Sequence, residues 1–157
     1  MIDLKLRAEI EDFYARYCAV LDEGPLEAWP DLFTEQCSYR LIPRENYRAG
    51  KPLATLAFES RGMLKDRIYC VQQTLFHQPY SQRHLLSGMQ FEAMQNDRYR
   101  VAANYLVIRT KVDEMADVLS VGRYYDELVR DGTTLRLAVK HCVFDNELIP
   151  NSLIYPI

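Results

Sequence analysis

The sequence predicts an α+β fold in which helices come first and one long antiparallel sheet follows. Before residue 78, apolar residues recur at three- and four-residue steps, which is typical of helices packed on a core. From His84 onward, long strand-like segments are separated by turn residues. Because helices and strands are segregated along the chain, a doubly wound α/β fold is not expected. Long strands must coil, and a sheet coiled around the first helix gives a cone-shaped domain.

The bulk composition limits the class of protein. A length of 157 residues suits a single domain that spans residues 1–157. The net charge of −3 provides no basic field, so nucleic acid and anionic membranes are poor candidates for a partner. No apolar run approaches the roughly 20 residues of a membrane helix, and the charged N-terminus lacks the apolar core of a signal peptide. We therefore expect a cytoplasmic protein.

The first half of the chain predicts two helices and a strand. Residues 3–22 form an amphipathic helix that Gly24-Pro25 ends. Residues 26–35 form a short second helix, which Pro30 must break or restart. Residues 37–42 alternate as a strand and end at a proline.

A loop, a third helix and four strands complete the chain. Residues 44–58 hold a Gly and a Pro among polar residues and are expected to form a loop. A third helix begins with Ser60 as its N-cap and ends before Pro79, because a residue that precedes proline disfavours helical geometry. Four strands follow, over residues 84–95, 98–111, 117–130 and 133–145.

Turn residues and glycines predict the shape of the sheet. Asn96-Asp97 and Asp131-Gly132 are expected to form hairpin turns, the second with both central residues able to accept positive φ. Gly88 and Gly122 are natural positions for bulges in strands of this length. The apolar tail, residues 153–157, is expected to add edge contacts or to enter an interface.

Cysteines and histidines are the side chains of this sequence that could bind a metal. The four cysteines are scattered without a CxxC pair, so we expect free thiols that are buried or half-buried. His77, His84 and His141 could provide two ligands of an iron or zinc site with a carboxylate, but no HxxxH or HxH spacing supports one. Nucleotide-binding glycine motifs and a GxSxG nucleophile elbow are also missing from the sequence.

A cone-shaped domain can also enclose the pocket of a small isomerase or dehydratase. Such an enzyme needs a buried carboxylate or histidine as general base, and hydroxyl donors to stabilise an enolate. Asp22 or His84 would be the base, with Tyr39, Tyr105 or His141 beside it. The alternative, which we favour, is that Asp22 is a solvated helix end and the tyrosines are packing residues.

The helix-to-strand passage around residues 58–88 concentrates charge. Asp66, Arg67 and Arg83 are expected to lie beside His84, as part of an interface or a buried ion-pair network. Arginine suits bidentate contacts to carboxylates, and Asp66 and Glu59 are possible partners of Arg83. The alternative is that Arg83 and His84 are polar residues at the start of a strand. The sequence is compatible with both interpretations.

Four segments together carry a family resemblance. They are Leu21-Asp22, WPDLFTEQCSYRL at 29–41, MLKDRI at 63–68 and PYSQRHLLS at 79–87. With them the chain resembles, over essentially its whole length, the small (beta) subunit of aromatic-ring-hydroxylating oxygenases of the Rieske non-haem iron class. Residues 43–67 are also similar to small subunits of enzymes that hydroxylate aromatic acids such as salicylate.

The resemblance implies a cystatin-like or NTF2-like cone without catalytic residues of its own. It implies that the chain assembles as a trimer and braces a large (alpha) subunit, in a hetero-hexamer of three large and three small chains. The Rieske 2Fe-2S cluster, the mononuclear iron and the substrate pocket are then in the large subunit, which oxygenates an aromatic compound bearing a carboxylate. The residues agree, because a Rieske centre uses Cys and His in CxH and CxxH pairs and the sequence contains neither.

The resemblance also guides the choice of structural residues. Arg67, Arg83 and His84 are expected to organise the junction of helix and sheet. Trp29, Phe33 and the apolar tail are expected to contact a partner chain, since aromatic residues and arginines carry much of the energy of interfaces.

Overall fold

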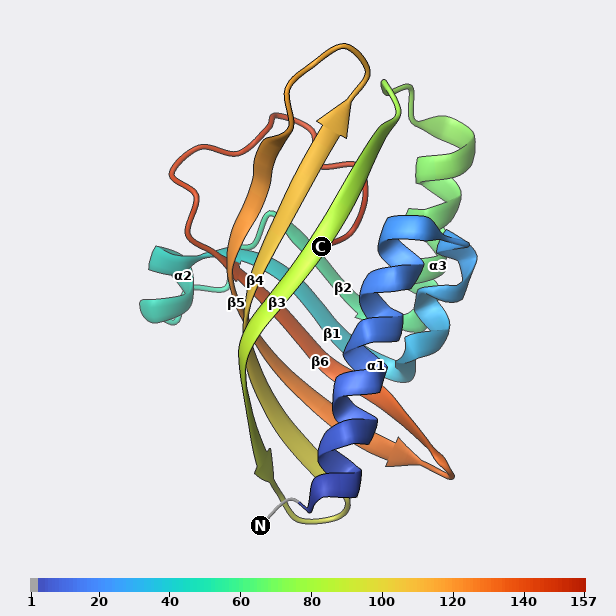
Figure 1. The fold of residues 1–157 in the computed structure, drawn as a ribbon, viewed down its shortest axis with the longest axis vertical. Helices are drawn as coiled ribbons and strands as arrows, with labels where there is room; N and C mark the ends of the chain where they lie inside the picture. Colours follow the sequence, from blue (N-terminus) through green and yellow to red (C-terminus); the bar gives the residue numbers. More distant parts are fainter. Residues whose placement is uncertain (1–2) are drawn as a thin grey trace.

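The computed structural model describes residues 3–157, which form a helical layer packed against one curled sheet (Figure 1). The six strands run in the order β2-β1-β6-β5-β4-β3. Neighbouring strands are antiparallel except β1 and β6, which are parallel. The elements are α1 (Leu4–Glu23), η1 (Leu26–Ala28), η2 (Pro30–Leu32), β1 (Phe33–Pro43), α2 (Arg44–Arg48), β2 (Leu56–Ser60), α3 (Arg61–Tyr69), η3 (Cys70–Thr74), β3 (Tyr80–Ala93), β4 (Arg98–Lys111), β5 (Asp117–Asp131) and β6 (Thr134–Phe144). The α+β cone expected from the sequence is confirmed.

The first helix matches its prediction closely. The side chain of Asp3 caps α1 by accepting a hydrogen bond from the Leu6 N–H at 2.7 Å. Gly24, with φ of 81°, ends the helix. One face of α1 is buried against the sheet, and it carries Ile10, Phe13, Tyr14, Tyr17 and Leu21. None of the helices in the described part of the chain has the length and apolar character to span a bilayer.

The region between α1 and α3 differs from the prediction. The expected second helix is two short 3₁₀ turns, η1 and η2, because Pro30 lacks the N–H that would continue a helix. Strand β1 starts at Phe33 rather than at residue 37. The expected loop at 44–58 contains the short helix α2 and most of strand β2, which pairs with β1 at the edge of the sheet.

The third helix begins as predicted and ends early. The Ser60 hydroxyl caps α3 by accepting from the Met63 N–H at 3.2 Å. Regular α-helix stops at Tyr69, and the single π-helical turn η3 closes with a bond from the Leu75 N–H to the Cys70 carbonyl. The chain is then extended enough for β3 to begin at Tyr80, before the predicted start at His84.

The strand pairing confirms one predicted bulge and corrects the other. The register of β3 and β4 shifts between Ser87 and Gln90, where Gly88 has φ of 59°. Gly122 pairs regularly instead, and its lack of a Cβ lets β6 approach, because a Cβ there would lie 2.0 Å from the Val143 carbonyl oxygen. In the turns, Asn96 and Asp97 both have positive φ, whereas of the second pair only Gly132 does.

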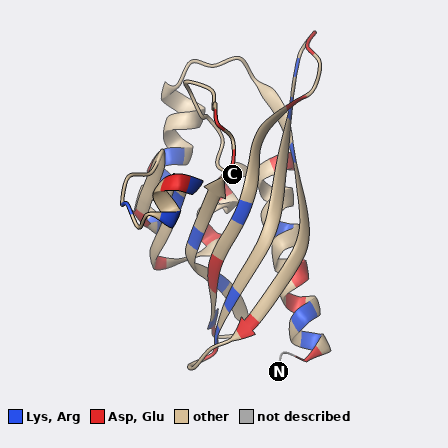
Figure 2. Ribbon diagram, turned by 90° about the vertical axis from the view of Figure 1, so that its left-hand side faces the viewer, with Lys and Arg blue, Asp and Glu red and all other residues tan. Residues whose placement is uncertain are grey.

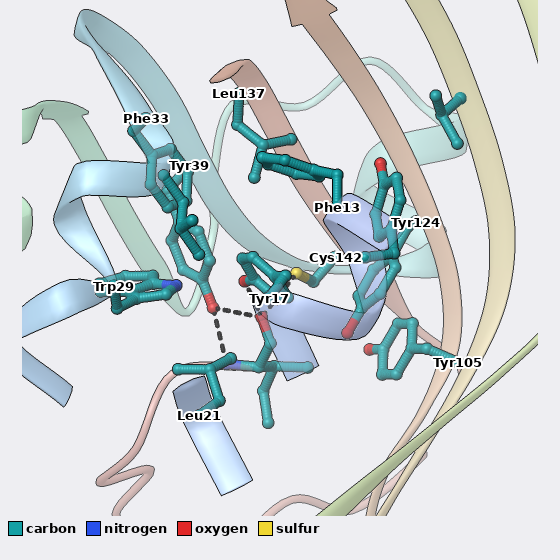
Figure 3. Packing of buried hydrophobic residues seen from close by; sticks show 14 of the residues in the cluster. Phe13, Tyr17, Leu21, Trp29, Phe33, Tyr39, Tyr105, Tyr124, Leu137 and Cys142 are labelled. Atoms are coloured by element: carbon teal, nitrogen blue, oxygen red, sulfur yellow. Dashed lines mark hydrogen bonds between the residues drawn. The ribbon is translucent and has the colours of Figure 1, made fainter. Parts of the chain in front are cut away.

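Aromatic side chains fill the inside of the cone (Figure 3). The largest fully buried ones include Trp29, Tyr14, Tyr17, Tyr39, Tyr105 and Tyr124. The tail enters the same space, and Ile157 is 0% exposed. The prediction that the tail adds edge contacts or joins an interface is therefore wrong: it packs into the core of its own chain. All four cysteines are free, two buried and two half-buried, as expected.

Candidate functional site

Asp22 and His84 form a buried pair where the end of α1 meets β3. The His84 Nδ1 lies 2.6 Å from one carboxylate oxygen of Asp22, and the His84 backbone N–H donates to the other at 2.8 Å. The two side chains are 4% and 0% exposed, respectively. Asp22 is therefore not the solvated helix end that we favoured. The imidazole Nε2 is buried and has no hydrogen-bond partner in the described part of the chain.

The other residues of the predicted enzyme pocket are divided between two faces of the sheet. Tyr105 bonds to Ser120 at 3.0 Å inside the cone. The hydroxyl of Tyr39 contacts the tail residue Ile157. His141 lies elsewhere, with its Nε2 3.3 Å from the Ser38 hydroxyl. Aromatic side chains and the tail residue Ile157 fill the inside of the cone, which disfavours an open catalytic pocket (Figure 3).

Arg67 binds the backbone of the tail, residues 153–157. Its Nη2 donates to the backbone carbonyl oxygens of Leu153 and Ile154, the second at 2.9 Å. Backbone carbonyls of an irregular segment need hydrogen-bond donors when they are buried, and the guanidinium of Arg67 donates to two of them. Arg67 thus joins α3 to the end of the chain rather than to His84.

Arg83 does not pair with Asp66 or Glu59, the partners predicted from the sequence. Arg83 bonds to Glu23 at 2.7 Å, and both side chains are more than 60% exposed. Glu59 lies 3.8 Å from Arg40 instead, and Asp66 is exposed on α3. Alternation along β3 explains this, because it turns His84 inward and Arg83 outward.

Trp29 and Phe33 are not available to a partner chain in this structure. Both are 0% exposed, and their rings pack edge-to-face with centroids 5.3 Å apart. Trp29 makes a second such contact with Tyr39, also at 5.3 Å. The expectation that these two residues contact a partner directly is therefore corrected: they stabilise the core.

A buried charged network escaped the sequence analysis. Lys140 Nζ lies 3.0 Å from Asp126, and the Tyr14 hydroxyl donates to the same carboxylate at 2.5 Å. Burial raises the pKa of Asp126, an effect that Lys140 opposes, and burial also raises the pKa of Tyr14. Both charged side chains are 0% exposed. The available signal was position: Asp126 alternates with the apolar, inward residues of β5.

The histidines do not assemble into a metal site. His77 contacts Tyr155, His84 contacts Asp22, and His141 contacts Ser38. Within residues 3–157, no group of three or more potential metal-binding side chains lies close enough together to hold an ion. The residues present therefore fit neither a Rieske cluster nor a mononuclear iron site, and no chemical step through iron is assigned to this chain.

Comparison with known proteins places this cone in a family. The model of the ring hydroxylating beta subunit family matches residues 16–151, which is most of the chain. The chain belongs to this family. It is a small subunit of the ring-hydroxylating dioxygenase type, as the sequence segments around Asp22, Arg67 and Arg83 indicated.

Relatives of this beta subunit agree in sequence and structure. The anthranilate 1,2-dioxygenase small subunit of Burkholderia cepacia is 32% identical over 99% of this chain and 96% of its own length. A solved structure described as the beta subunit of an aromatic-ring-hydroxylating dioxygenase from Novosphingobium aromaticivorans is also 32% identical. It superposes with a TM-score of 0.88 and covers 99% of this chain and 100% of its own. A scytalone dehydratase-like structure from the same organism, at 19% identity and a TM-score of 0.69 over 88% of this chain and 83% of its own, shares the fold alone.

Proposed function

We propose that this beta subunit is a non-catalytic brace for the large subunit of an oxygenase that acts on an aromatic carboxylate. The observation that carries the proposal is the family match over residues 16–151. The substrate class follows the anthranilate 1,2-dioxygenase small subunit, whose name identifies a substrate that is an aromatic acid. Fold alone does not assign function, since the same cone occurs in other kinds of protein.

The proposed assembly has three large and three small chains, with the small chains associating as a trimer. The large subunit would carry the Rieske 2Fe-2S cluster and the mononuclear iron. This chain would act as one domain over its whole length, in the cytoplasm. The packed interior supports a bracing role, because a core filled by aromatic side chains resists deformation.

The surface offers two features for contact with the large subunit. The exposed Arg83–Glu23 pair lies where α1 ends beside β3. The outer face of the sheet carries exposed apolar residues, among them Leu85 at 48% and Val118 at 52%. Charged residues of both signs are scattered over this sheet, and long stretches of its strands carry none (Figure 2). Arginine with apolar surroundings is a common composition of interface centres.

Co-expression tests the proposal. The chain would be produced together with the reading frames that neighbour its gene, and purified by size-exclusion chromatography with light scattering and an iron assay. We expect it to co-elute with a larger, iron-containing chain at a mass near three copies of each. Elution of the chain by itself, free of iron and bound to no neighbouring product, would contradict the bracing role.

A further inference from the structure

A hollow of about 480 Å³ lies where β2, helix α3 with its final turn η3, and the irregular segment after β6 meet. Apolar side chains such as Leu56 and Leu75 line it, together with the neutral polar side chains of Thr55 and Ser152. The one charged residue in its lining is Arg67, so we call it the Arg67 hollow. Its volume lies within the range of small-molecule sites in proteins, roughly 300–1,000 Å³.

The guanidinium of Arg67 is only partly used by the chain itself. Its hydrogen bonds run from Nη2, to the carbonyl oxygens of Leu153 and Ile154. Nε is buried and has no hydrogen-bond partner within residues 3–157. Both partners of Nη2 are neutral carbonyl groups, so no negative charge of the described residues balances this cation.

Two other arginines on the same layer of the molecule show what is missing at Arg67. Arg61 bonds to Glu35 at 2.5 Å, and Arg109 bonds to Asp117 at 2.5 Å. The side chains of these arginines are 16% and 15% exposed, and Arg67 is likewise half-buried. Removing a cation from water is costly unless an anion compensates it. A carboxylate bound in the hollow would supply that charge to Arg67.

The rest of the lining indicates what the carboxylate would be attached to. Leu56, Leu75, Ile149 and Leu153 are aliphatic, and the lining holds no aromatic ring. It also holds no aspartate or glutamate that would repel an anion. A ligand with a flexible aliphatic body can pack on these side chains, and each CH₂ group that it buries adds about 0.8 kcal/mol of binding free energy.

We propose that the Arg67 hollow is a binding site for a small organic carboxylate with an aliphatic body. The carboxylate binds the guanidinium of Arg67, and the body packs on Leu56 and Leu75. The hydroxyls of Thr55 and Ser152 provide neutral donors beside it. Because Arg67 also holds the tail, a bound carboxylate stabilises the junction of α3 with the end of the chain. The proposal concerns this chain alone and does not rest on the large subunit.

Titration of the full chain with hexanoate tests the site. Hexanamide is the control with the same body and no charge, and acetate is the control with the charge and no body. We expect hexanoate to bind saturably and at least about tenfold more tightly than hexanamide, because hydrogen bonds to charged groups are the stronger ones. Acetate should bind at least about tenfold more weakly than hexanoate. In NMR spectra hexanoate should shift the amide signals of residues 149–154, and it should raise the Tm.

Two substitutions at Ser152 locate the site. Ser152 is exposed and lines the hollow, so neither substitution disturbs the core or the bonds of Arg67. Ser152→Glu puts a carboxylate beside Arg67 and should weaken hexanoate binding by about tenfold or more, because the new side chain competes for the cation. Ser152→Gln is the matched control of nearly the same size, and it should keep hexanoate binding within about threefold of the native value.

Arg67→Gln removes the cation itself and should abolish the preference for hexanoate over hexanamide. If this variant does not fold, because Arg67 also holds the tail, the two Ser152 variants decide the matter. No saturable binding of hexanoate to the full chain, or equal binding of hexanoate and hexanamide, would overturn the proposal. So would an equal loss of hexanoate binding in Ser152→Glu and Ser152→Gln, or amide shifts confined to residues that do not line the hollow.

Discussion

Asp126 and Lys140 face each other across β5 and β6, and both are buried with Tyr14 against them. Such a pair contributes little net stability when it is compared with apolar residues of the same size. Loss of one partner is different, because it leaves an uncompensated charge in the core. The network therefore favours a single register of the two strands, since a shift by one residue would separate the charges.

We predict that Lys140→Met lowers the free energy of unfolding by about 3–5 kcal/mol, because Asp126 would remain buried without its cation. Asp126→Asn keeps an acceptor for the Tyr14 hydroxyl, but it leaves Lys140 buried without its anion. We therefore expect this variant to lower the free energy of unfolding as well. The double variant should lose much less than the sum of the two losses. Urea unfolding of all four proteins gives the coupling energy. Additive losses would show that the two charges do not stabilise one another.

A pH effect is expected at His141, on the outer side of the sheet. Burial lowers the pKa of His141 below its ordinary value of 6.5, and the charge of Arg40 adds to this. The imidazole lies between Ser38, Tyr47 and Tyr125. Below about pH 6.5 the unfolded chain then binds a proton more readily than the folded chain, so stability falls as the pH decreases.

We expect His141→Gln to reduce the loss of stability between pH 7 and pH 5. Above pH 7, where His141 is neutral in both the folded and the unfolded chain, the variant should depend on pH in the same way as the native chain. The measurement is the urea midpoint at several pH values for the native chain and the variant. His77→Gln is the matched control, because His77 lies outside the sheet next to Tyr155. An unchanged slope in His141→Gln would mean that other groups cause the acid sensitivity.

At the scale of elements, Gly122 in β5 and Gly62 in α3 differ in the space available for a side chain. A Cβ added to Gly122 would lie 2.8 Å from the Phe144 Cα, so the backbone of β6 occupies the space that a side chain would need. Gly62 in α3 has only the Ser60 hydroxyl oxygen at 3.6 Å, which is an ordinary contact. The first glycine is required by packing, and the second is not.

Gly122→Ala should destabilise the protein by about 1–3 kcal/mol or more, because β5 and β6 must separate beside the buried Phe144. Gly62→Ala should stabilise it by about 0.4–1 kcal/mol, since alanine loses less backbone entropy in a helix. Chemical denaturation of both variants tests the contrast. Similar stability of the two variants would show that the strands at Gly122 have room to move.

The sequence predicts the bounds of the long, periodic elements closely, and it does not predict the short elements that carry few repeats of a pattern. α1 and the strands β4 and β5 match their predicted bounds to within about two residues, because each carries a long periodic pattern. β2 was missed, since five residues at a sheet edge provide few repeats of the strand pattern. The π-helical turn η3 was predicted as helix because its apolar spacing continues that of α3.

On the scale of the whole molecule, the chain is a cone whose interior is filled by its own side chains, and the proposed contacts with the large subunit lie on its outer surface. Of the predicted charged cluster, Asp66 and Arg83 stay accessible, and Arg83 pairs with Glu23. An exposed ion pair contributes little to folding, which leaves its charges available to another chain. This differs from the buried Asp126–Lys140 network, where a change would destabilise the fold.

Arg83→Glu should therefore fold normally, with a free energy of unfolding within about 0.5 kcal/mol of the native value. Its binding to the large subunit should weaken by roughly tenfold or more, because a like charge would face Glu23 and any carboxylate on the partner. Arg100→Glu is the matched control, as Arg100 forms a similarly exposed pair with Glu92. Co-elution with the large subunit at increasing salt measures both variants. Equal behaviour of the two would remove Arg83 from the proposed interface.

The sequence by itself determined the order of elements, the fold class and the family, because these depend on local periodicity and on motifs that lie within short segments. It also identified Asp22, Arg67 and His84 as residues of interest. Only the tertiary structure decided their partners. Arg83 binds Glu23 because the packing of α1 on β3 brings the two side chains together. The tail enters the cone because donors from α1, β1 and β6, distant in the sequence, converge where Ile157 lies. Contacts of this kind depend on how elements pack in three dimensions, which no periodicity along one chain records.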